Sequence, residues 1–358
     1  MKRLKNKVIK KTTTTELARP STRITNDTVK EHREKVLAEG RKFKYPVQYS
    51  RHKLIINSIL ITLVTIILFV VFVWWQLYPM QNTSNFFYRI TQLVPVPVAS
   101  VDGQFVRYSD YLVRYRSSEH YLQQEDPETF NSKTVERQKN HLKRESMDRA
   151  QADAYAQKLA EQYDITVSNE EADNLIRQER ESQEQKLSER AYESAVLKGF
   201  YGWSLGEYQQ IVKNTLLKRK VAFKVDKAAK EKIDTINKQL QARGADFGKI
   251  AAKNSDDEMA ATNKGDVGFV ARNSQDPEGL VKAANALDKG EVSEVIKGTN
   301  AYYIIKVTDK NDVQVRYSRI KVDLTQFEKN LEKLRKEGKI DEFINIPKTD
   351  AIKITKQG

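Results

Sequence analysis

Few side chains in this sequence could take part in covalent or metal chemistry. There is no cysteine, and of the four histidines His32 and His52 precede a long apolar segment while His120 and His141 stand alone. Without cysteine there are no thiolate nucleophiles, thiol metal ligands or disulfides. The sequence contains no phosphate-binding loop, nucleophile elbow or HExxH motif. Hydrolases and nucleotide enzymes therefore find no support, and we expect neither a metal nor a cofactor.

An uncharged apolar segment of 24 residues runs from Leu54 to Leu77. A helix of that length measures about 36 Å, enough to cross a hydrocarbon core of roughly 30 Å. Trp74, Trp75 and Tyr78 stand at its C-terminal end, and such rings prefer the headgroup level. Residues 54–78 are therefore predicted to form a transmembrane helix in contact with the lipid bilayer, since a cleaved signal peptide would be shorter.

The charge distribution predicts the orientation of this helix. Residues 1–53 hold 16 Lys or Arg and five acids, so they supply most of the formal net charge of +14. Basic flanks stay in the cytoplasm, which predicts a single-pass protein of the cytoplasmic membrane with an extracytoplasmic C-terminal body. That body is nearly neutral, and we expect no nucleic-acid partner. The polar, basic tail of residues 1–53 is expected to be disordered.

The body after the apolar segment is predicted to be α+β. Residues 79–94 show no clear periodicity and are predicted to form a stalk. A β-prone run, a turn at Asp102–Gly103 and a second short strand lead into a helix that begins near Ser109. Further helices are indicated by apolar residues at three- and four-residue spacing and by two capping boxes, Ser168 with Glu171 and Ser204 with Glu207.

Motifs in this body resemble those of a known group of proteins. ASVDGQFVRYSD at 99–110 resembles the strand pair that opens a SurA-type chaperone module. Four further motifs resemble those of parvulin-type peptidyl-prolyl isomerase domains: DFGKIA with NSDD at 246–257, KGDVGF at 264–269, ALDKGEVS at 286–293 and YYIIKV at 302–307. The order of these motifs resembles the SurA/PrsA/PpiD group of extracytoplasmic foldases. The resemblance implies a mostly helical chaperone module at residues 95–225 and a parvulin-like domain at residues 226–310.

The resemblance also implies a four-stranded antiparallel sheet packed by helices, and it leaves residues 311–358 with two possible places. Val313–Val322 resembles the strand that opens a parvulin domain, so it could complete the isomerase sheet in permuted order. Alternatively, this strand and the helix Thr325–Lys336 could return to the chaperone module, as the C-terminal segment does in SurA-like proteins. The sequence does not choose between these arrangements.

Prolyl isomerisation crosses a barrier of about 18–20 kcal/mol without a covalent step, and needs only a site that prefers the twisted amide. Parvulins are understood to use an apolar pocket and a pair of histidines beside a Cys or Asp. Both histidines are absent here. Transferred by motif, Asp257 takes the Cys/Asp position, Tyr303 the second histidine position and Arg319 that of the first. The peptide pocket falls on Phe269, Gln275 or Asp276, and Leu280, together with Arg319.

These features favour a membrane-anchored extracytoplasmic chaperone or foldase with lost or reduced isomerase activity. Its partners would be unfolded or nascent secreted and membrane polypeptides, together with the secretion machinery from which they emerge. Exposed aromatic residues of the helical module would bind them, with Tyr111, Tyr115, Tyr121, Phe200, Tyr201 and Trp203 as candidates. Two alternatives stay open: an active peptidyl-prolyl cis-trans isomerase with a non-standard site, and a structural envelope adaptor.

Overall fold

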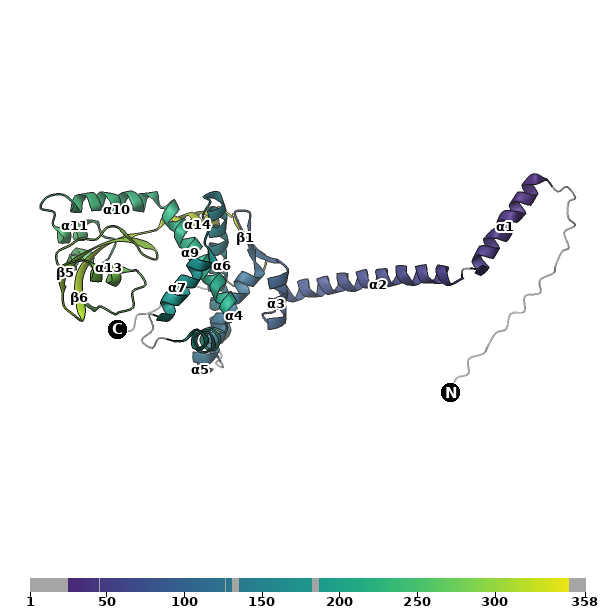
Figure 1. Ribbon diagram of the computed structural model, residues 1–358, viewed down its shortest axis with the longest axis horizontal. Helices are drawn as coiled ribbons and strands as arrows, with labels where there is room; N and C mark the ends of the chain where they lie inside the picture. The colour runs from purple at the N-terminus through teal and green to yellow at the C-terminus, as the bar shows by residue number, and fades with distance from the viewer. Residues whose placement is uncertain (1–24, 45, 126, 131–134, 182–186, 348–358) are drawn as a thin grey trace. The chain divides into compact units, whose positions relative to one another are not determined.

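The computed structural model describes residues 25–44, 46–125, 127–130, 135–181 and 187–347 (Figure 1). Contacts divide the chain into two units, Met1–Phe72 and Val73–Gly358. In the first unit, Asn26–Lys44 form helix α1, whereas the sequence predicted disorder for the tail. Most of its residues are good helix formers, and the Thr28 hydroxyl donates to the Thr25 carbonyl at its start. The rest of the tail prediction falls mainly on residues 1–24, outside the described residues.

Helix α2 (Pro46–Leu77) contains the apolar segment. Within the described part of the chain, His52–Leu77 is the one helix whose length and composition would allow it to cross a membrane, with a mean hydropathy of 2.9. Two of its hydroxyl groups are bonded inside the helix, because Thr62 and Thr65 donate to the carbonyl oxygens of Ser58 and Ile61 at 2.8 and 2.9 Å. This local bonding leaves no hydroxyl of these threonines to face an apolar environment unpaired.

The second unit contains a hairpin and long helices that share one core, called the first core below. β1 (Pro97–Val101) pairs antiparallel with β2 (Gln104–Arg107) through the predicted turn, and on its other side with β7 (Ile340–Glu342). Helices α4 (Tyr108–Glu125) and α6 (Val135–Gln162) pack on this sheet. Tyr111 and Tyr115 lie inside the core and stack on each other, so they are not surface for clients. Tyr121, Phe200 and Tyr201 are exposed as expected.

Residues 79–94 do not form a stalk, which corrects the sequence prediction. They contain helix α3 (Asn85–Leu93), whose Phe87, Tyr88 and Thr91 are buried. These positions share one helical face, and that face packs into the same core as Leu77. A nine-residue helix is too short to be stable alone, so packing rather than propensity forms it.

The remaining helices of this part of the chain include those that form a smaller apolar cluster of Ala172, Ile176, Tyr192, Leu197 and Val212. Both predicted capping boxes are present. The elements are α5 (Pro127–Phe130), α7 (Asn169–Glu181), α8 (Glu189–Ala191), a π-helix at Tyr192–Tyr201 (η1) and α9 (Leu205–Val225).

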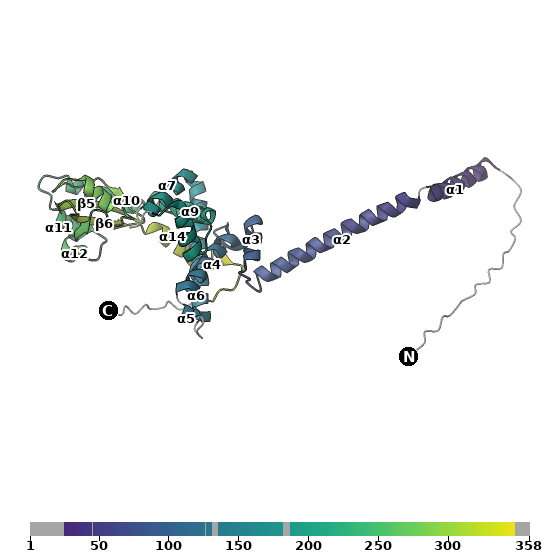
Figure 2. The ribbon, with the colours of Figure 1, turned by 60° about the horizontal axis from the view of Figure 1, so that its bottom comes forward.

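A second, four-stranded antiparallel sheet has the order β3-β6-β5-β4. Its strands are β3 (Asp266–Ala271), β4 (Ile296–Lys297), β5 (Ala301–Lys310) and β6 (Gln314–Asp323). Helices α10 (Lys227–Leu240) and α11 (Phe247–Asn254) pack on one face, and α13 (Leu280–Ala286) packs on the other. Figure 2 shows α10, α11 and the short α12 (Ala260–Asn263) gathered around β5 and β6.

The C-terminal segment is divided between the two parts of the body. β6 lies in the middle of the four-stranded sheet, paired with both β5 and β3. After it the chain returns: α14 (Gln326–Lys336) buries Phe327 and Leu331 in the first core, and β7 joins β1. The strand therefore completes the four-stranded sheet, as in the first arrangement that the sequence left open. The following helix returns to the helical module, as in the second.

Candidate functional site

Several of the residues matched to the parvulin motif meet on one face of the four-stranded sheet. On β5 and β6, Ile305 lies opposite Arg319 and Tyr303 lies opposite Lys321. Directly opposed residues of antiparallel strands point to the same face, so these four side chains share the face that α13 covers. Tyr303 and Leu280 are both buried there, with 4% and 3% of their surface exposed.

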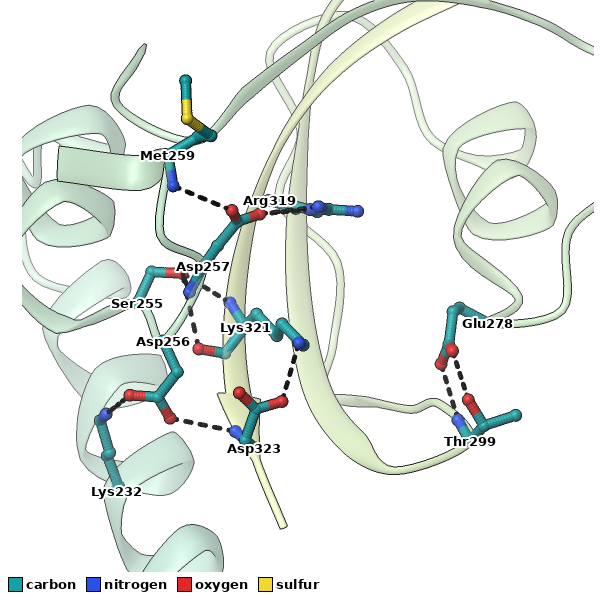
Figure 3. A network of polar contacts seen from close by, with 10 residues as sticks. All are labelled: Lys232, Ser255, Asp256, Asp257, Met259, Glu278, Thr299, Arg319, Lys321 and Asp323. Atoms are coloured by element: carbon teal, nitrogen blue, oxygen red, sulfur yellow. Dashed lines mark hydrogen bonds and ion pairs between the residues drawn. The ribbon is translucent and has the colours of Figure 1, made fainter. Parts of the chain in front are cut away.

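Asp257 and Arg319 form an ion pair at the rim of this face (Figure 3). The guanidinium donates from Nε and from a terminal nitrogen to Asp257 Oδ2, at 2.8 and 2.7 Å. The Met259 backbone N–H donates to Oδ1 at 3.2 Å. Burial opposes ionisation of Asp257, but the hydrogen bonds from Arg319 and Met259 outweigh it and lower the pKa of the carboxyl. The Arg319 side chain is thus held in place by its ion pair with the Asp257 carboxylate.

The segment around Asp257 also holds β6 in place. Asp256 N–H donates to the Lys321 carbonyl at 2.8 Å, and the Asp323 N–H donates to the Asp256 carboxylate at 3.0 Å. The Ser255 hydroxyl accepts from the Lys321 N–H at 3.0 Å. These contacts continue the ladder of β6 beyond the end of β3, so the NSDD motif fixes a strand as well as supplying a site residue.

Gly265 completes this attachment. Its carbonyl accepts the Arg319 N–H at 2.8 Å, and its φ is +80°. A Cβ at this position would lie 2.4 Å from the Arg319 carbonyl oxygen. Only glycine allows so close an approach of the two backbones with this φ, so the motif glycine places Arg319.

Tyr303 is enclosed by a second polar contact. Glu278 accepts hydrogen bonds from the Thr299 backbone N–H at 2.6 Å and from the Thr299 hydroxyl. Gly298 lies under this contact, where a Cβ would be 2.1 Å from the Glu278 carboxylate and 2.5 Å from the Tyr303 ring. Burial, with the Glu278 charge, raises the pKa of the Tyr303 phenol. Tyr303 is consequently neutral at physiological pH and packed on its ring edge.

Two of the predicted pocket residues do not join this face. Phe269 lies opposite Arg316, whose guanidinium sits 5.7 Å from the ring centre, on the other side of the sheet from Tyr303. A β-bulge between Asp266 and Gly268 sets the register and with it the face that Phe269 takes. Gln275 is exposed in the loop before α13. Phe269 is therefore corrected from a pocket residue to an exposed residue of the opposite face.

Other residues of the face were not predicted. Lys321 follows Arg319 by two positions on the same strand, so strand alternation could have identified it once β6 was placed. It pairs with Asp323 at 2.8 Å. Glu278 and Thr299 lie in loops, where no spacing reveals their contact. Among the described residues, no group of three or more His, Asp or Glu side chains is arranged to hold a metal ion.

The helical module contains a separate cavity of about 360 Å³, most of whose lining residues are polar. Arg114 and Asp153 form an ion pair in its wall, and the Tyr88 hydroxyl donates to the Glu207 carboxylate at 2.6 Å. Asp110 also lines it, and burial raises the pKa of this carboxyl. The cavity offers hydrogen-bonding groups at the junction of α3, α4, α6 and α9.

Comparisons with known proteins match both parts of the body. Residues 50–222 match the SurA-like N-terminal domain, and residues 216–309 match the PPIC-type PPIASE domain. The second match begins inside α9, which is helical to Val225, and ends before β6. The central strand β6, which carries Arg319, therefore lies outside it.

Among curated proteins, the foldase protein PrsA of Staphylococcus aureus strains Newman and USA300 is 36% identical over 99 residues. This match covers 28% of the chain and 31% of the relative, so the chain aligns with about a third of the length of these proteins. The crystal structure of foldase protein PrsA from Streptococcus pneumoniae str. Canada MDR_19A covers 68% of this chain and 86% of that chain, at 19% identity. The TM-score of this comparison is 0.20, which does not indicate a shared overall fold.

Proposed function

We propose that this chain, which is SurA/PrsA-like in both parts of its body, is a membrane-anchored extracytoplasmic foldase that has lost most of its isomerase activity. It would bind unfolded or nascent polypeptides and act mainly as a chaperone. The observation that carries the loss of activity is the Asp257–Arg319 ion pair, which stands where the family resemblance places a histidine.

The chemistry of the two substituted positions supports this proposal. A histidine pair can be neutral near pH 7 and can exchange the donor and acceptor roles of its ring nitrogens. Arg319 donates only, keeps its charge and is held by Asp257. Tyr303 is buried between Gly298 and Glu278. A fixed cation and an enclosed phenol do not stabilise a twisted prolyl amide more than its planar cis and trans forms.

A protease-coupled prolyl-peptide assay on the full chain in lipid nanodiscs tests the loss of activity. We expect turnover more than about tenfold below that of an ordinary parvulin, which is a barrier higher by about 1.4 kcal/mol. Asp257→Ala should leave the residual rate unchanged, as should the matched exposed variant Asp256→Ala. Turnover within tenfold of a parvulin, abolished by Asp257→Ala alone, would instead support an active isomerase with a non-standard site.

The membrane anchor is supported by the apolar helix His52–Leu77 and by the basic residues that precede it. Because the chain has no cysteine, single cysteines can report topology. Lys35→Cys lies on exposed α1, and Val313→Cys on an exposed turn of the body. In intact cells lacking an outer barrier, an impermeant maleimide should label residue 313 and not residue 35. Labelling of both, or of neither until lysis, would contradict the proposed topology.

Polypeptide binding is supported by exposed aromatic residues of the helical module, Tyr121, Phe200 and Tyr201. We expect the nanodisc-bound chain to suppress aggregation of an unfolded client without ATP, and Phe200→Ser with Tyr201→Ser to weaken this suppression. Photocrosslinking from residue 200 in cells should capture a range of secreted precursors. Capture of one folded envelope protein instead would favour the structural adaptor.

A further inference from the structure

Exposed apolar side chains occur in the last turn of the apolar helix and in the segment that follows it. Between Trp74 and Val94 they are Trp74, Trp75, Met80, Phe86, Leu93 and Val94. Leu93 is 86% exposed, the highest value among the exposed large apolar side chains of the described residues. In a soluble environment such a cluster is unfavourable, and clusters of this kind mark interaction surfaces.

The start of α3 lies beside the last turn of α2. The Met80 N–H donates to the Trp75 carbonyl at 3.2 Å, and the Asn82 N–H donates to the Gln76 carbonyl at 2.9 Å. The Asn82 side chain also donates to Gln76 Oε1 at 2.8 Å. The connection between the helices is therefore folded back on α2. It cannot carry α3 away from the place where α2 ends.

The core of the body holds α3 firmly through its buried face. The Arg116 guanidinium donates to the Thr83 carbonyl and to Asn85 Oδ1, both at 2.5 Å, and lies over the Tyr88 ring. Tyr88 in turn donates to Glu207. These contacts fix the rotation of α3 about its own axis. The opposite face is then presented outward as a rigid surface.

That outward face carries Phe86, Arg89 and Leu93, which recur at three- and four-residue spacing, and Val94 follows it. Two apolar side chains with a basic residue between them suit the boundary between lipid headgroups and acyl chains. There the apolar groups embed, and the Arg89 stem can extend to bring its charge to phosphate groups.

We infer that α3 is an interfacial helix that rests on the outer leaflet of the bilayer, with Phe86, Leu93 and Val94 inserted at headgroup depth. This inference depends on the proposed membrane anchor, because lipid is the occupant indicated by a surface that directly adjoins the end of the spanning helix. A body held at two places, by α2 and by α3, would keep one defined orientation over the membrane and not swing on its tether.

Depth-dependent fluorescence quenching in the cysteine-free chain tests this inference. The full chain carries a single environment-sensitive label at Leu93→Cys or Phe86→Cys and is reconstituted in vesicles with lipids spin-labelled at a shallow or a deep acyl position. We expect labels at 86 and 93 to lose more fluorescence to the shallow quencher than to the deep one. The matched control is Val313→Cys, another highly exposed aliphatic position, which should lose none.

A label at Ile67→Cys, in the middle of the apolar segment, separates the two proposals. If residue 67 is quenched by the deep lipid and residues 86 and 93 are not quenched, α3 is not interfacial although the anchor holds. If residue 67 is not quenched, the anchor itself fails. A second variant, Arg89→Glu with the label at 93, should lower the shallow quenching in vesicles of anionic lipid. An unchanged value would remove the role assigned to Arg89.

Discussion

The chain passes twice between the helical module and the four-stranded sheet, and Asp226 lies at the first crossing and contacts the second. It is the C-cap of α9 and the N-cap of α10, and only 2% of its surface is exposed. Oδ1 accepts the Ala229 N–H at 2.9 Å, as an N-cap should. Oδ2 accepts the N–H groups of Thr325 and Gln326 at 2.7 and 2.9 Å, where the chain returns to α14.

Asp226→Ala removes all three acceptor contacts. Loss of the cap costs about 1 kcal/mol. The two other N–H groups would be left near the protein interior without an acceptor, at about 1–3 kcal/mol each. We therefore expect the free energy of unfolding to fall by about 3–5 kcal/mol, allowing for partial access of water. Asp226→Asn keeps one oxygen and should fall between the parent chain and the alanine variant.

Urea unfolding of the full chain in nanodiscs, monitored by far-UV circular dichroism, measures this loss of unfolding free energy. Amide hydrogen exchange shows which residues it affects. Exchange should accelerate at residues 325 and 326 as well as at residue 229. Asp246→Ala is the matched control, because Asp246 is exposed and its cap contacts, led by the Lys249 N–H, stay within the first turn of α11. If both alanine variants lose the same stability, the contacts to α14 contribute nothing and the reasoning fails.

Three further predictions concern the four-stranded sheet. Gly265→Ala should destabilise the chain more than Gly268→Ala in urea unfolding, because both have a positive φ but only residue 265 would place a Cβ against a backbone oxygen. Asp257, whose pKa is lowered in the folded state, stabilises the chain above its unfolded pKa of about 3.9 and loses this contribution as pH falls through the folded pKa. Asp257→Asn should thus reduce the acid dependence of stability, and an unchanged acid limb would contradict the ion pair. A fragment of residues 226–310 should lack dispersed amide resonances, whereas residues 226–326 should show them, because β6 supplies two of the sheet's three strand pairings.

Local signals in the sequence predicted local structure well. Ser204 with Glu207 forms the predicted capping box, and Asp102–Gly103 forms the predicted turn with positive φ at both residues. Each depends on contacts within a few residues, which the sequence states directly. The helix α3 was missed because burial of Phe87 and Tyr88 in a core built by distant segments decides its structure.

The site was predictable in its residue types but not in its assembly. The motif match selected Asp257 and Arg319, and the resemblance of residues 313–322 to a parvulin strand predicted a strand there, but neither signal names the partner strand. β6 pairs with β5, which directly precedes it in the sequence, and with β3, which lies much further away. Such a pairing follows from the order of strands in the whole sheet and not from a local pattern. Phe269 was misplaced for a related reason, since a single bulged residue reverses the faces of a strand.

The position of β6 explains why a foldase-like chain would use a site position for a salt bridge. The sheet is complete only when its last strand enters between β3 and β5, just before the chain returns to the helical module. Arg319 lies on that last strand, and Asp257 lies in the first half of the domain. Their ion pair therefore ties the closing strand to the part already formed, alongside the Gly265 contact. A histidine at residue 319 would hold the strand less firmly, because an imidazole cannot donate two hydrogen bonds to Asp257 Oδ2 as the guanidinium does. Position 319 can therefore hold either the arginine that ties the closing strand to the domain or the histidine that would catalyse isomerisation.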